Sequence, residues 1–304
     1  MIIVGNGHVV TRDSRNPYVP DGAVAIDGTK ICGIGRTADL RKRFPEASFI
    51  DAKDGVIMPA FINTHEHIYS AMARGLHIEG YAPKGFLDIL DGLWWNMDRH
   101  LTNDLTYLSA MATYVECIKS GVTTIFDHHA SFGEIKDSLF AIGQAAQEMG
   151  VRSCLCYEVS DRDGADKARQ AVLENEAWIR HAQQDTTDML AGMMGMHAQF
   201  TLSDETMNLA AEHKPDGVGY HIHVAEGIED LHDCLKNTAN ASSTACMIGR
   251  FSGQRPCSVT VSTSMLMRWT SSRKRIRWSF TTLSRIWAMP AAVRRRWKWF
   301  TAVS

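Results

Sequence analysis

The stretch "FINTHEHIYSAMARG", residues 61–75, places two histidines one residue apart at the end of an apolar run. In a β-strand, residues i and i+2 point to the same side, so His65 and His67 present two imidazoles to one space while Glu66 faces away. The same spacing returns in "HIHVAE", residues 221–226, where Glu226 lies three positions after His223. One such pair is a weak signal, but two pairs at strand ends predict a metal site.

Five apolar, strand-like runs alternate with helical patterns from residue 56 onward. The expected strands are 56–63, 122–127, 152–158, 190–197 and 219–224, and the expected helices are 103–119, 134–149, 165–182 and 203–213. This alternation predicts a parallel sheet covered by helices and favours an α/β fold of the (β/α)8 TIM-barrel type, with about five βα units in this sequence.

Polar residues stand where the expected strands end, which is where chemistry lies in a barrel. They are Asn63 to His67, Asp127 to His129, Glu158, His197, and His221 to Glu226. Imidazole-rich sites with an open position suit zinc or iron(II), and a nearby carboxylate that is not a ligand can move protons. Glu226 is the candidate for that carboxylate.

The first 55 residues alternate short β-prone segments with turns, and Asp27-Gly28 is a hairpin signal between two such segments. A small antiparallel β-unit is expected there. The 304 residues, 45% of them hydrophobic, are enough for one large domain or one domain with a smaller one.

Composition favours a cytoplasmic protein without a membrane segment. The longest apolar runs are far shorter than the ~20 residues that cross a bilayer, and the first residues lack the basic start of a signal peptide. The seven cysteines are an odd number scattered over the chain. They indicate free thiols in a reducing compartment and no disulfide framework.

The net charge of −2 hides a break near Asn237. Residues 1–236 hold 20 Lys and Arg against 34 Asp and Glu, whereas residues 237–304 hold 12 Lys and Arg and no Asp, Glu or His. Five of the eight tryptophans also lie in those last residues. The two parts of the sequence therefore follow different constraints.

Four segments of the chain resemble the amidohydrolase superfamily, in the branch of cytosine, guanine and adenosine-type deaminases and triazine chlorohydrolases. They are "VIMPAFINTHEH" (56–67), "KSGVTTIFDHHAS" (119–131), "GMMGMHAQFTLSDET" (192–206) and "HIHVAE" (221–226). The pieces "LWWNMDR", "DHHAS" and "SDRDG" are most similar to SsnA-type aminohydrolases. The resemblance covers about residues 1–236.

This resemblance implies that His65, His67 and His223 bind one divalent metal, zinc first and iron(II) as the alternative. It implies that Glu226 is the proton shuttle, that His197 contacts a small aminated substrate, and that His221 is only a neighbour of the ligands. The implied reaction is hydrolysis of a C–N bond other than a peptide bond, by metal-activated hydroxide attack. Residues 1–55 correspond to a small β-sandwich portion, and residues 56–236 to part of the barrel.

Several alternatives stay open on the sequence alone. The same scaffold carries chlorohydrolases and amide hydrolases, and the chain could also be a metal-binding fragment without catalysis. His128 and His129 are site candidates of undefined role. The Trp94-Trp95 pair fits a pocket for a planar substrate, but aromatic residues beside a helix more often belong to the core. The substrate and the oligomeric state, a homo-oligomer included, are undetermined.

The family pattern has three further elements that residues 237–304 lack. These are a histidine after the sixth strand, a His-Asn-Pro segment after the seventh and an aspartate after the eighth. Shifting the codon frame by two bases permits a His-Asn-Pro segment across 278–290 and a histidine within 256–263. The hypothesis is that the frame slips near Asn237, so that 237–304 form an out-of-frame tail without native fold.

The basic tail therefore has no selected partner, and neither nucleic acid nor a membrane surface is expected to bind it. A sheet of about five strands leaves an edge and apolar faces exposed. We expect this chain to be poorly soluble and inactive, although it keeps three metal ligands and the carboxylate.

Overall fold

The computed structural model describes residues 1–224, 226, 227, 229, 230, 260 and 261. The chain divides into two compact units, the first Met1–Phe61 and the second beginning at Ile62. Within the segment 237–304 only Thr260 and Val261 are described, so the expectation of an out-of-frame tail lies outside the described residues.

The first unit is one five-stranded sheet with a short helix. Its elements are β1 (Ile2–Val10), β2 (Tyr18–Asp27), β3 (Lys30–Arg36), α1 (Thr37–Arg43), β4 (Ser48–Asp51) and β5 (Val56–Ile57). The strand order is β3-β2-β1-β4, with β5 also paired to β1. Gly28, at φ +56°, forms the predicted tight turn between β2 and β3.

The sheet of the first unit is mixed, which corrects the expectation of an antiparallel unit. β1, β2 and β3 are antiparallel neighbours, whereas β4 and β5 run parallel to β1. The reason is α1, because a helical connection after β3 returns the chain to the starting edge and lets β4 run in the direction of β1.

The second unit is built from parallel strands and covering helices. Its strands are β6 (Phe61–Glu66), β7 (Val122–His129), β8 (Arg152–Tyr157), β9 (Leu190–Gly192), β10 (Met194–Ala198), β11 (Tyr220–Val224) and β12 (Thr260–Val261). Its longer helices are α4 (Asn103–Lys119), α5 (Ser138–Met149), α6 (Ala165–Ala182) and α7 (Asp204–His213). Short helical segments are η1 (Ile68–Ala73), α2 (Phe86–Ile89), η2 (Leu90–Trp94), α3 (Trp95–Asp98) and η3 (Gln199–Thr201).

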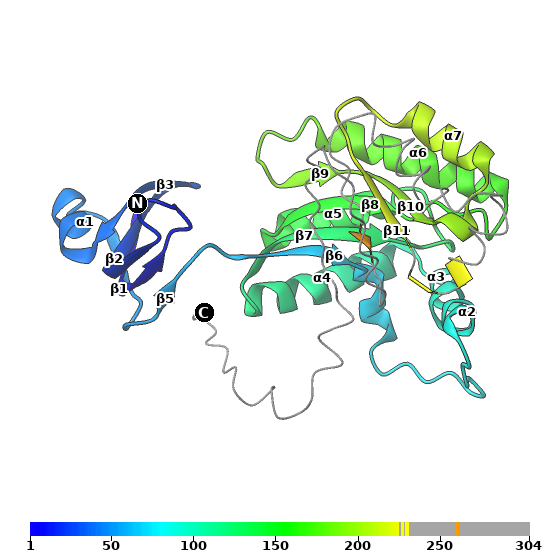
Figure 1. The fold of residues 1–304 in the computed structure, drawn as a ribbon, viewed down its shortest axis with the longest axis horizontal. Helices are drawn as coiled ribbons and strands as arrows, with labels where there is room; N and C mark the ends of the chain where they lie inside the picture. Colours follow the sequence, from blue (N-terminus) through cyan, green and yellow to red (C-terminus); the bar gives the residue numbers. More distant parts are fainter. Residues whose placement is uncertain (225, 228, 231–259, 262–304) are drawn as a thin grey trace, which may run out of the picture. The chain divides into compact units, whose positions relative to one another are not determined.

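The strands of the second unit follow one another in chain order, as a barrel wall requires. One sheet has the order β6-β7-β8-β9 and another the order β10-β11-β12, and a parallel bridge between Val159 and Met196 joins their neighbouring edges. Figure 1 shows α4, α5, α6 and α7 outside these strands. The parallel βα arrangement predicted from the sequence is therefore present in the described residues.

Two expected strands are each divided in two. The run 56–63 becomes β5 in the first unit and β6, because Pro59 between them has no N–H for a ladder. The run 190–197 becomes β9 and β10, which pair with different strands on either side of Met193. The expected helix 134–149 begins only at Ser138, since Asp137 has a left-handed backbone conformation, φ +66°.

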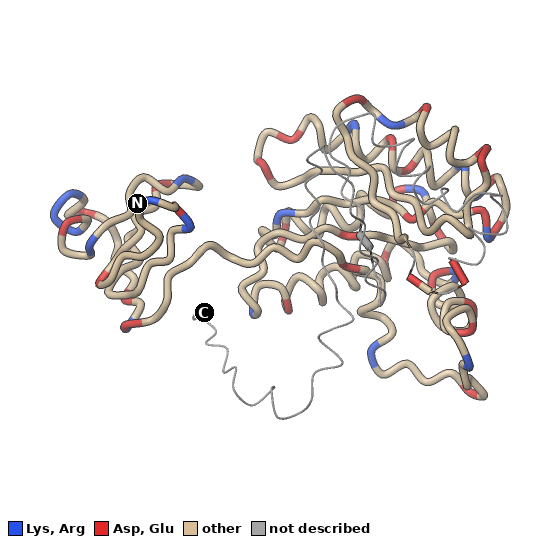
Figure 2. The backbone as a smooth tube through the Cα atoms, in the orientation of Figure 1, with Lys and Arg blue, Asp and Glu red and all other residues tan. Residues whose placement is uncertain are grey.

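The core of the second unit lies between the strands and the helices. Its largest fully buried side chains include Tyr114, Tyr157 and Trp178, and Ile125, Leu139 and Leu155 fill the space around them. Figure 2 shows few charged residues on the central strands. Asp127 and Glu158 are exceptions that are fully or nearly fully buried, and buried charges of this kind require partners.

Asn175 of α6 holds together the point where β8 and β10 separate. Its Oδ1 accepts hydrogen bonds from the backbone N–H groups of Tyr157, at 2.8 Å, and Gly195, at 3.2 Å. Its Nδ2 donates to the carbonyl of Tyr157 at 3.0 Å. The amide thus satisfies the backbone of Tyr157, which precedes Glu158, and of Gly195, which lies two residues before His197.

Glu174, the neighbour of Asn175, caps the start of α5. Its carboxylate accepts from the backbone N–H groups of Asp137, at 2.9 Å, and Leu139, at 3.0 Å. Burial raises the pKa of Glu174 to about 7, although these two donors lower it. The folded state therefore favours the protonated carboxyl more than the unfolded state does.

This raised pKa predicts a pH-dependent stability. The contribution of Glu174 is complete below its unfolded pKa of about 4.5 and is lost as the pH rises through about 7. Relative to Glu174→Gln, which does not titrate, the wild-type chain should lose about 3 kcal/mol of unfolding free energy over that range. Urea unfolding of both chains at several pH values measures this difference, and a constant difference would contradict the prediction.

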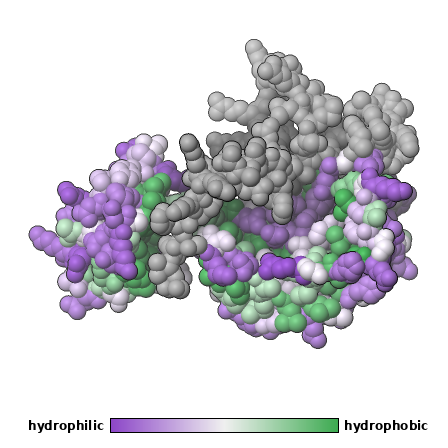
Figure 3. Space-filling view, turned by 90° about the horizontal axis from the view of Figure 1, so that it is seen from below, coloured by the Kyte–Doolittle hydropathy of each residue, from purple (hydrophilic) through white to green (hydrophobic). Residues whose placement is uncertain are grey.

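The outward face of α4 carries apolar side chains. Leu105, Leu108, Val115 and Ile118 are 37%, 53%, 43% and 50% exposed. Figure 3 shows hydrophobic residues interspersed with hydrophilic ones on the side seen there. Among the described helices, none has the length and apolar character needed to cross a membrane.

Candidate metal centre

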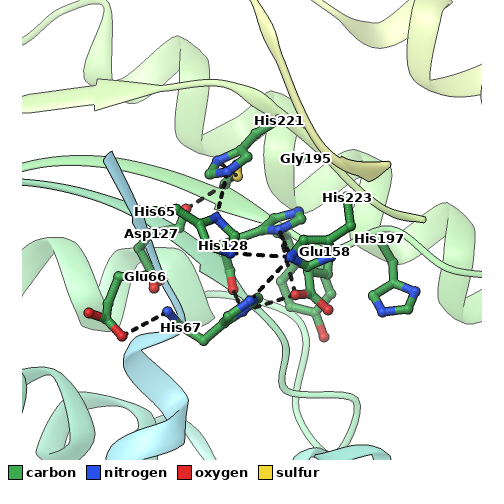
Figure 4. Close-up of polar contacts among 12 residues, drawn as sticks. His65, Glu66, His67, Asp127, His128, Glu158, Gly195, His197, His221 and His223 are labelled. Carbon is green, nitrogen blue, oxygen red and sulfur yellow. Dashed lines mark hydrogen bonds and ion pairs between the residues drawn. The ribbon is translucent and has the colours of Figure 1, made fainter. Parts of the chain in front are cut away.

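Four histidines from three strands meet at the C-terminal ends of the parallel strands. His65 lies near the end of β6 and His67 directly follows this strand, while His128 comes from the end of β7 and His223 from β11. One ring nitrogen of each lies within 4.8 Å of the corresponding nitrogens of the others. Figure 4 shows the rings of His65, His67 and His223 turned toward one another, with Glu66 on the other side of β6.

The Nε2 atom of His223 is the centre of this group. It lies 3.3 Å from His65 Nε2, 3.2 Å from His67 Nε2 and 3.4 Å from His128 Nδ1. The structure thus brings together His65, His67 and His223, the three residues for which the sequence resemblance implies metal binding. It adds His128, which was a site candidate of undefined role.

The second ring nitrogens of His65 and His67 are hydrogen-bonded outside the group. His65 Nδ1 lies 3.0 Å from His221 Nε2, so His221 adjoins a candidate ligand, as expected. His67 Nδ1 donates to the carbonyl of His128, at 2.7 Å, and also lies 3.1 Å from Glu158 Oε1. These contacts occupy Nδ1 of both rings, so Nε2 of each is the nitrogen that can bind a metal ion.

Burial keeps most of these imidazoles neutral. It lowers the pKa of His65 to about 2, and that of His128 and His223 well below the ordinary value, with the neighbouring histidines lowering each further. Neutral imidazole is the form that binds metal ions. At neutral pH these three rings carry no extra proton, so a cation can bind to them without displacing one.

Glu158, immediately after β8, is the carboxylate of the centre. Its side chain is 3% exposed, and its Oε1 lies 3.1 Å from His67 Nδ1 and 3.6 Å from His128 Nδ1. Burial alone raises the pKa of Glu158, but the hydrogen bond from His67 and the nearby histidines lower it below the ordinary value. Burial likewise lowers the pKa of His67, but Glu158 raises it to about 9.

Glu226 and His197 lie at the edge of the group. Glu226 follows β11, and its Oε2 lies 4.0 Å from His223 Nδ1, with 32% of its side chain exposed. His197, near the end of β10, is buried, and its ring centre is 5.6 Å from that of His223. Its Nδ1 lies 2.8 Å from Thr201 Oγ1, so its Nε2 is the nitrogen left for another partner.

The two neighbouring tryptophans, Trp94 and Trp95, have different surroundings. Trp94 packs against the core of the second unit. Trp95 stands edge-on to His197, with ring centres 6.0 Å apart, and the guanidinium of Arg162 lies 5.2 Å from its ring centre. Arg162 in turn pairs with the buried Asp98. Trp95 is therefore the member of the pair beside the centre.

His128 and His129 also separate, because neighbouring strand residues face opposite sides. The Nδ1 of His128 joins the imidazole group, whereas His129 Nε2 lies 3.0 Å from Ser131 Oγ. The alternation along β7 predicts that the two rings face opposite sides, but which side faces the centre depends on the neighbouring strands. Asp127, on the same side as His129, accepts from the backbone N–H of Ile68 at 2.7 Å and anchors η1 after His67.

Curated proteins with similar sequences include several deaminases. A 5'-deoxyadenosine deaminase of Methanosarcina barkeri is 30% identical over 233 residues, which are 76% of this chain and 50% of that protein. A 5-methylthioadenosine/S-adenosylhomocysteine deaminase of Pelotomaculum thermopropionicum is 27% identical over 234 residues, with the same shares. The chain thus spans about half the length of the curated relatives it matches.

Solved structures share the fold. Atrazine chlorohydrolase TrzN from Arthrobacter aurescens, complexed with zinc, superposes with a TM-score of 0.68 at 19% identity, covering 88% of this chain and 62% of the other. The E. coli guanine deaminase gives 0.67 at 16% identity, covering 88% and 63%. At these identities the likeness establishes the fold.

Family profiles match both units. Residues 22–47 match an imidazolonepropionase-like composite domain of bacteria. Residues 56–244, more than half of the chain, match the amidohydrolase family, and this range contains all four histidines of the centre. The resemblance seen in the sequence is therefore confirmed, and the chain belongs to the amidohydrolase family.

Proposed function

We propose that this chain carries the metal centre of a metal-dependent aminohydrolase, which releases ammonia from a small aminated substrate by hydrolysis of a C–N bond. The observation that carries the proposal is the approach of His65 and His67 to His223, at 3.3 and 3.2 Å between Nε2 atoms, with Glu226 beside them. The deaminase names of the relatives in sequence support the reaction class.

The residues of the centre fit a divalent cation. Their donors are imidazoles, which suit zinc and also iron(II), and the buried carboxylate of Glu158 supplies negative charge close by. Without a cation, His67 alone carries the compensating proton. A bound divalent ion supplies Lewis acidity and lowers the pKa of water. We propose zinc, held by His65, His67 and His223.

The side chains around the cation would transfer protons and bind the substrate. We propose that Glu226 takes a proton from the attacking water and delivers it to the departing amino group. Water provides the oxygen of the new C–O bond, and the amino group leaves as ammonia with one proton from that water, while the other proton stays with the hydroxylated product. We propose that His197 contacts the substrate through Nε2, and that Trp95 lies against its planar ring.

An aminated purine nucleoside is the first substrate class to test, because the relatives are named for 5'-deoxyadenosine and 5-methylthioadenosine. A chlorohydrolase on the same scaffold is the second candidate, favoured by the fold shared with atrazine chlorohydrolase. The two differ in the leaving group, so ammonia and chloride release separate them.

The test combines metal content with product release. The purified chain is depleted of metal, reloaded with zinc, and assayed with aminated purines, pyrimidines, guanidino compounds and a chlorinated triazine. Zinc-dependent ammonia release supports the aminohydrolase, and chloride release supports the alternative. Stoichiometric zinc binding without product would leave a metal-binding fragment, and failure to bind zinc would overturn the proposed centre.

The proposed frame slip near Asn237 has its own test, which is sequencing of the coding DNA across codons 230–245. A corrected base there would change residues 237–304 and should be followed by the same assay on the corrected protein. An unchanged reading supports our expectation that the 304-residue chain is poorly soluble and inactive. The buried free thiols of Cys117, Cys154 and Cys156 agree with a proposed reducing, cytoplasmic location.

Glu158 provides a prediction on metal affinity. Replacement by glutamine removes the negative charge beside His67 while keeping the size of the side chain, and should weaken zinc binding by about 10–100-fold. The carbonyl of His128 still accepts from His67 Nδ1, so the ring keeps its orientation. Competition with a chelator measures the affinity. Glu174→Gln, which changes a buried carboxyl outside the centre, is the control and should bind zinc like the wild type.

A further inference from the structure

We propose that His128 is a fourth protein ligand of the metal ion, binding through Nδ1. This inference rests on the proposed metal centre and extends it, because the sequence pattern implied only His65, His67 and His223. With His128 included, the described residues would supply four imidazole ligands to the metal ion. The case rests on the spacing of the nitrogens, on the surroundings of His128 and on its contrast with His129.

Three of the six distances among the four nitrogens, those from His223 Nε2, match the edges of a metal-centred tetrahedron, and all six lie within 4.8 Å. Four imidazole nitrogens around zinc at about 2.0–2.1 Å lie about 3.3–3.4 Å apart along each tetrahedral edge. His223 Nε2 lies 3.3, 3.2 and 3.4 Å from its three neighbours, and the longest of these distances belongs to His128 Nδ1. Relative to His223 Nε2, His128 is therefore as well placed as His65 and His67.

Hydrogen bonding among the rings does not explain this convergence. A ring nitrogen carries either one hydrogen or one lone pair in the ring plane, so His223 Nε2 can form only one good hydrogen bond. Three nitrogens nevertheless stand within 3.4 Å of it. A single cation shared by all four satisfies every one of them at once.

The surroundings of His128 leave its Nδ1 without a better partner. The side chain is completely buried, and Glu158 Oε1 is 3.6 Å away, beyond hydrogen-bond length. The ring is held in place by stacking on His221, with centres 4.4 Å apart and planes 8° from parallel. Stacking constrains the plane of the ring, and within that plane Nδ1 lies 3.4 Å from His223 Nε2.

The neighbouring His129 is the matched comparison. It is equally buried and belongs to the same strand, but it faces the other side, where Nε2 meets Ser131 Oγ at 3.0 Å. A histidine kept for packing alone would resemble His129. The replacements His128→Gln and His129→Gln therefore alter two equally buried positions of the same strand. Only the first removes a proposed metal ligand.

The experiment measures zinc affinity of the 304-residue chain and the visible absorption of its cobalt(II) form. Second-sphere changes typically weaken metal binding by about 10–100-fold, so loss of a direct ligand should exceed about 100-fold in His128→Gln. His129→Gln should bind zinc like the wild type. The cobalt spectrum should change only in His128→Gln, because the ligand set changes only there. His128→Ala with added imidazole should regain affinity, since free imidazole can occupy the vacated position.

The outcomes separate this inference from the proposed function. If the wild type binds zinc and His223→Gln loses it, while His128→Gln keeps the affinity and the cobalt spectrum, His128 is not a ligand and the proposed centre stands. Equal weakening by His128→Gln and His129→Gln, without rescue by imidazole, also overturns the inference. If the wild-type chain binds no zinc, the proposed centre and this inference fail together.

Discussion

Replacing Asp98 by asparagine should lower the free energy of unfolding of the second unit by about 3–5 kcal/mol, because the charge of Arg162 loses its buried partner. The side chains of Asp98 and Arg162 are 0% and 5% exposed. The guanidinium lies 4.0 Å from the ring centre of Phe132 and 5.2 Å from that of Trp95, so water cannot easily replace the carboxylate. Urea unfolding followed by circular dichroism measures the loss.

The chain supplies a control in the adjacent residues. Arg99 and Asp163 form an equivalent pair at 2.7 Å, but the Arg99 side chain is 36% exposed. Asp163→Asn should therefore cost less than about 1 kcal/mol. A second variant, Asp98→Asn with Arg162→Met, should recover much of the loss because it removes the stranded charge. Equal effects of Asp98→Asn and Asp163→Asn would show that burial does not govern the pair.

Replacing Glu226 by glutamine should lower the turnover number by about 10²–10⁴-fold, the usual contribution of a positioned proton-transfer group. Glutamine keeps the size and hydrogen-bonding length of the side chain but cannot carry the proton. Zinc affinity should be unchanged, because Glu226 stands 4.0 Å from His223 Nδ1 and away from Nε2. The measurement is steady-state ammonia release by the form of the protein that shows zinc-dependent activity.

Glu229→Gln is the companion to this variant, since it changes a carboxylate three residues further along the same segment. It should leave both turnover and zinc affinity as they are. A Glu226→Gln protein with wild-type turnover would remove Glu226 from the mechanism. Loss of zinc together with turnover would instead assign Glu226 to metal binding.

The sequence predicts part of the centre because strand geometry acts over two residues. His65 and His67 share a side whatever the partners of β6, and His223 stands at the end of β11, where a barrel collects its polar groups. Gly28 marked the hairpin for an equally local reason, its positive φ. These inferences needed no knowledge of distant contacts.

Other features depended on contacts that no local pattern records. Glu158 was visible as a polar residue at a strand end, but its partner His67 is 91 positions earlier and its burial comes from packing. The choice between His128 and His129 depended on which side of β7 faces the other strands. The division of the run 190–197 arose because β9 and β10 pair with different neighbours, and Met193 itself carries no break signal.

The separation of the histidines along the chain also has a kinetic consequence. His65 and His223 are 158 positions apart, and His128 and His223 are 95 apart. Closing such long loops is slow, so the four nitrogens come together only when β6, β7 and β11 have all assembled. A cation that binds this late should slow unfolding far more than it accelerates folding. The concentration of available metal would then determine how long the folded chain resists proteolysis, whether or not the protein has catalytic activity.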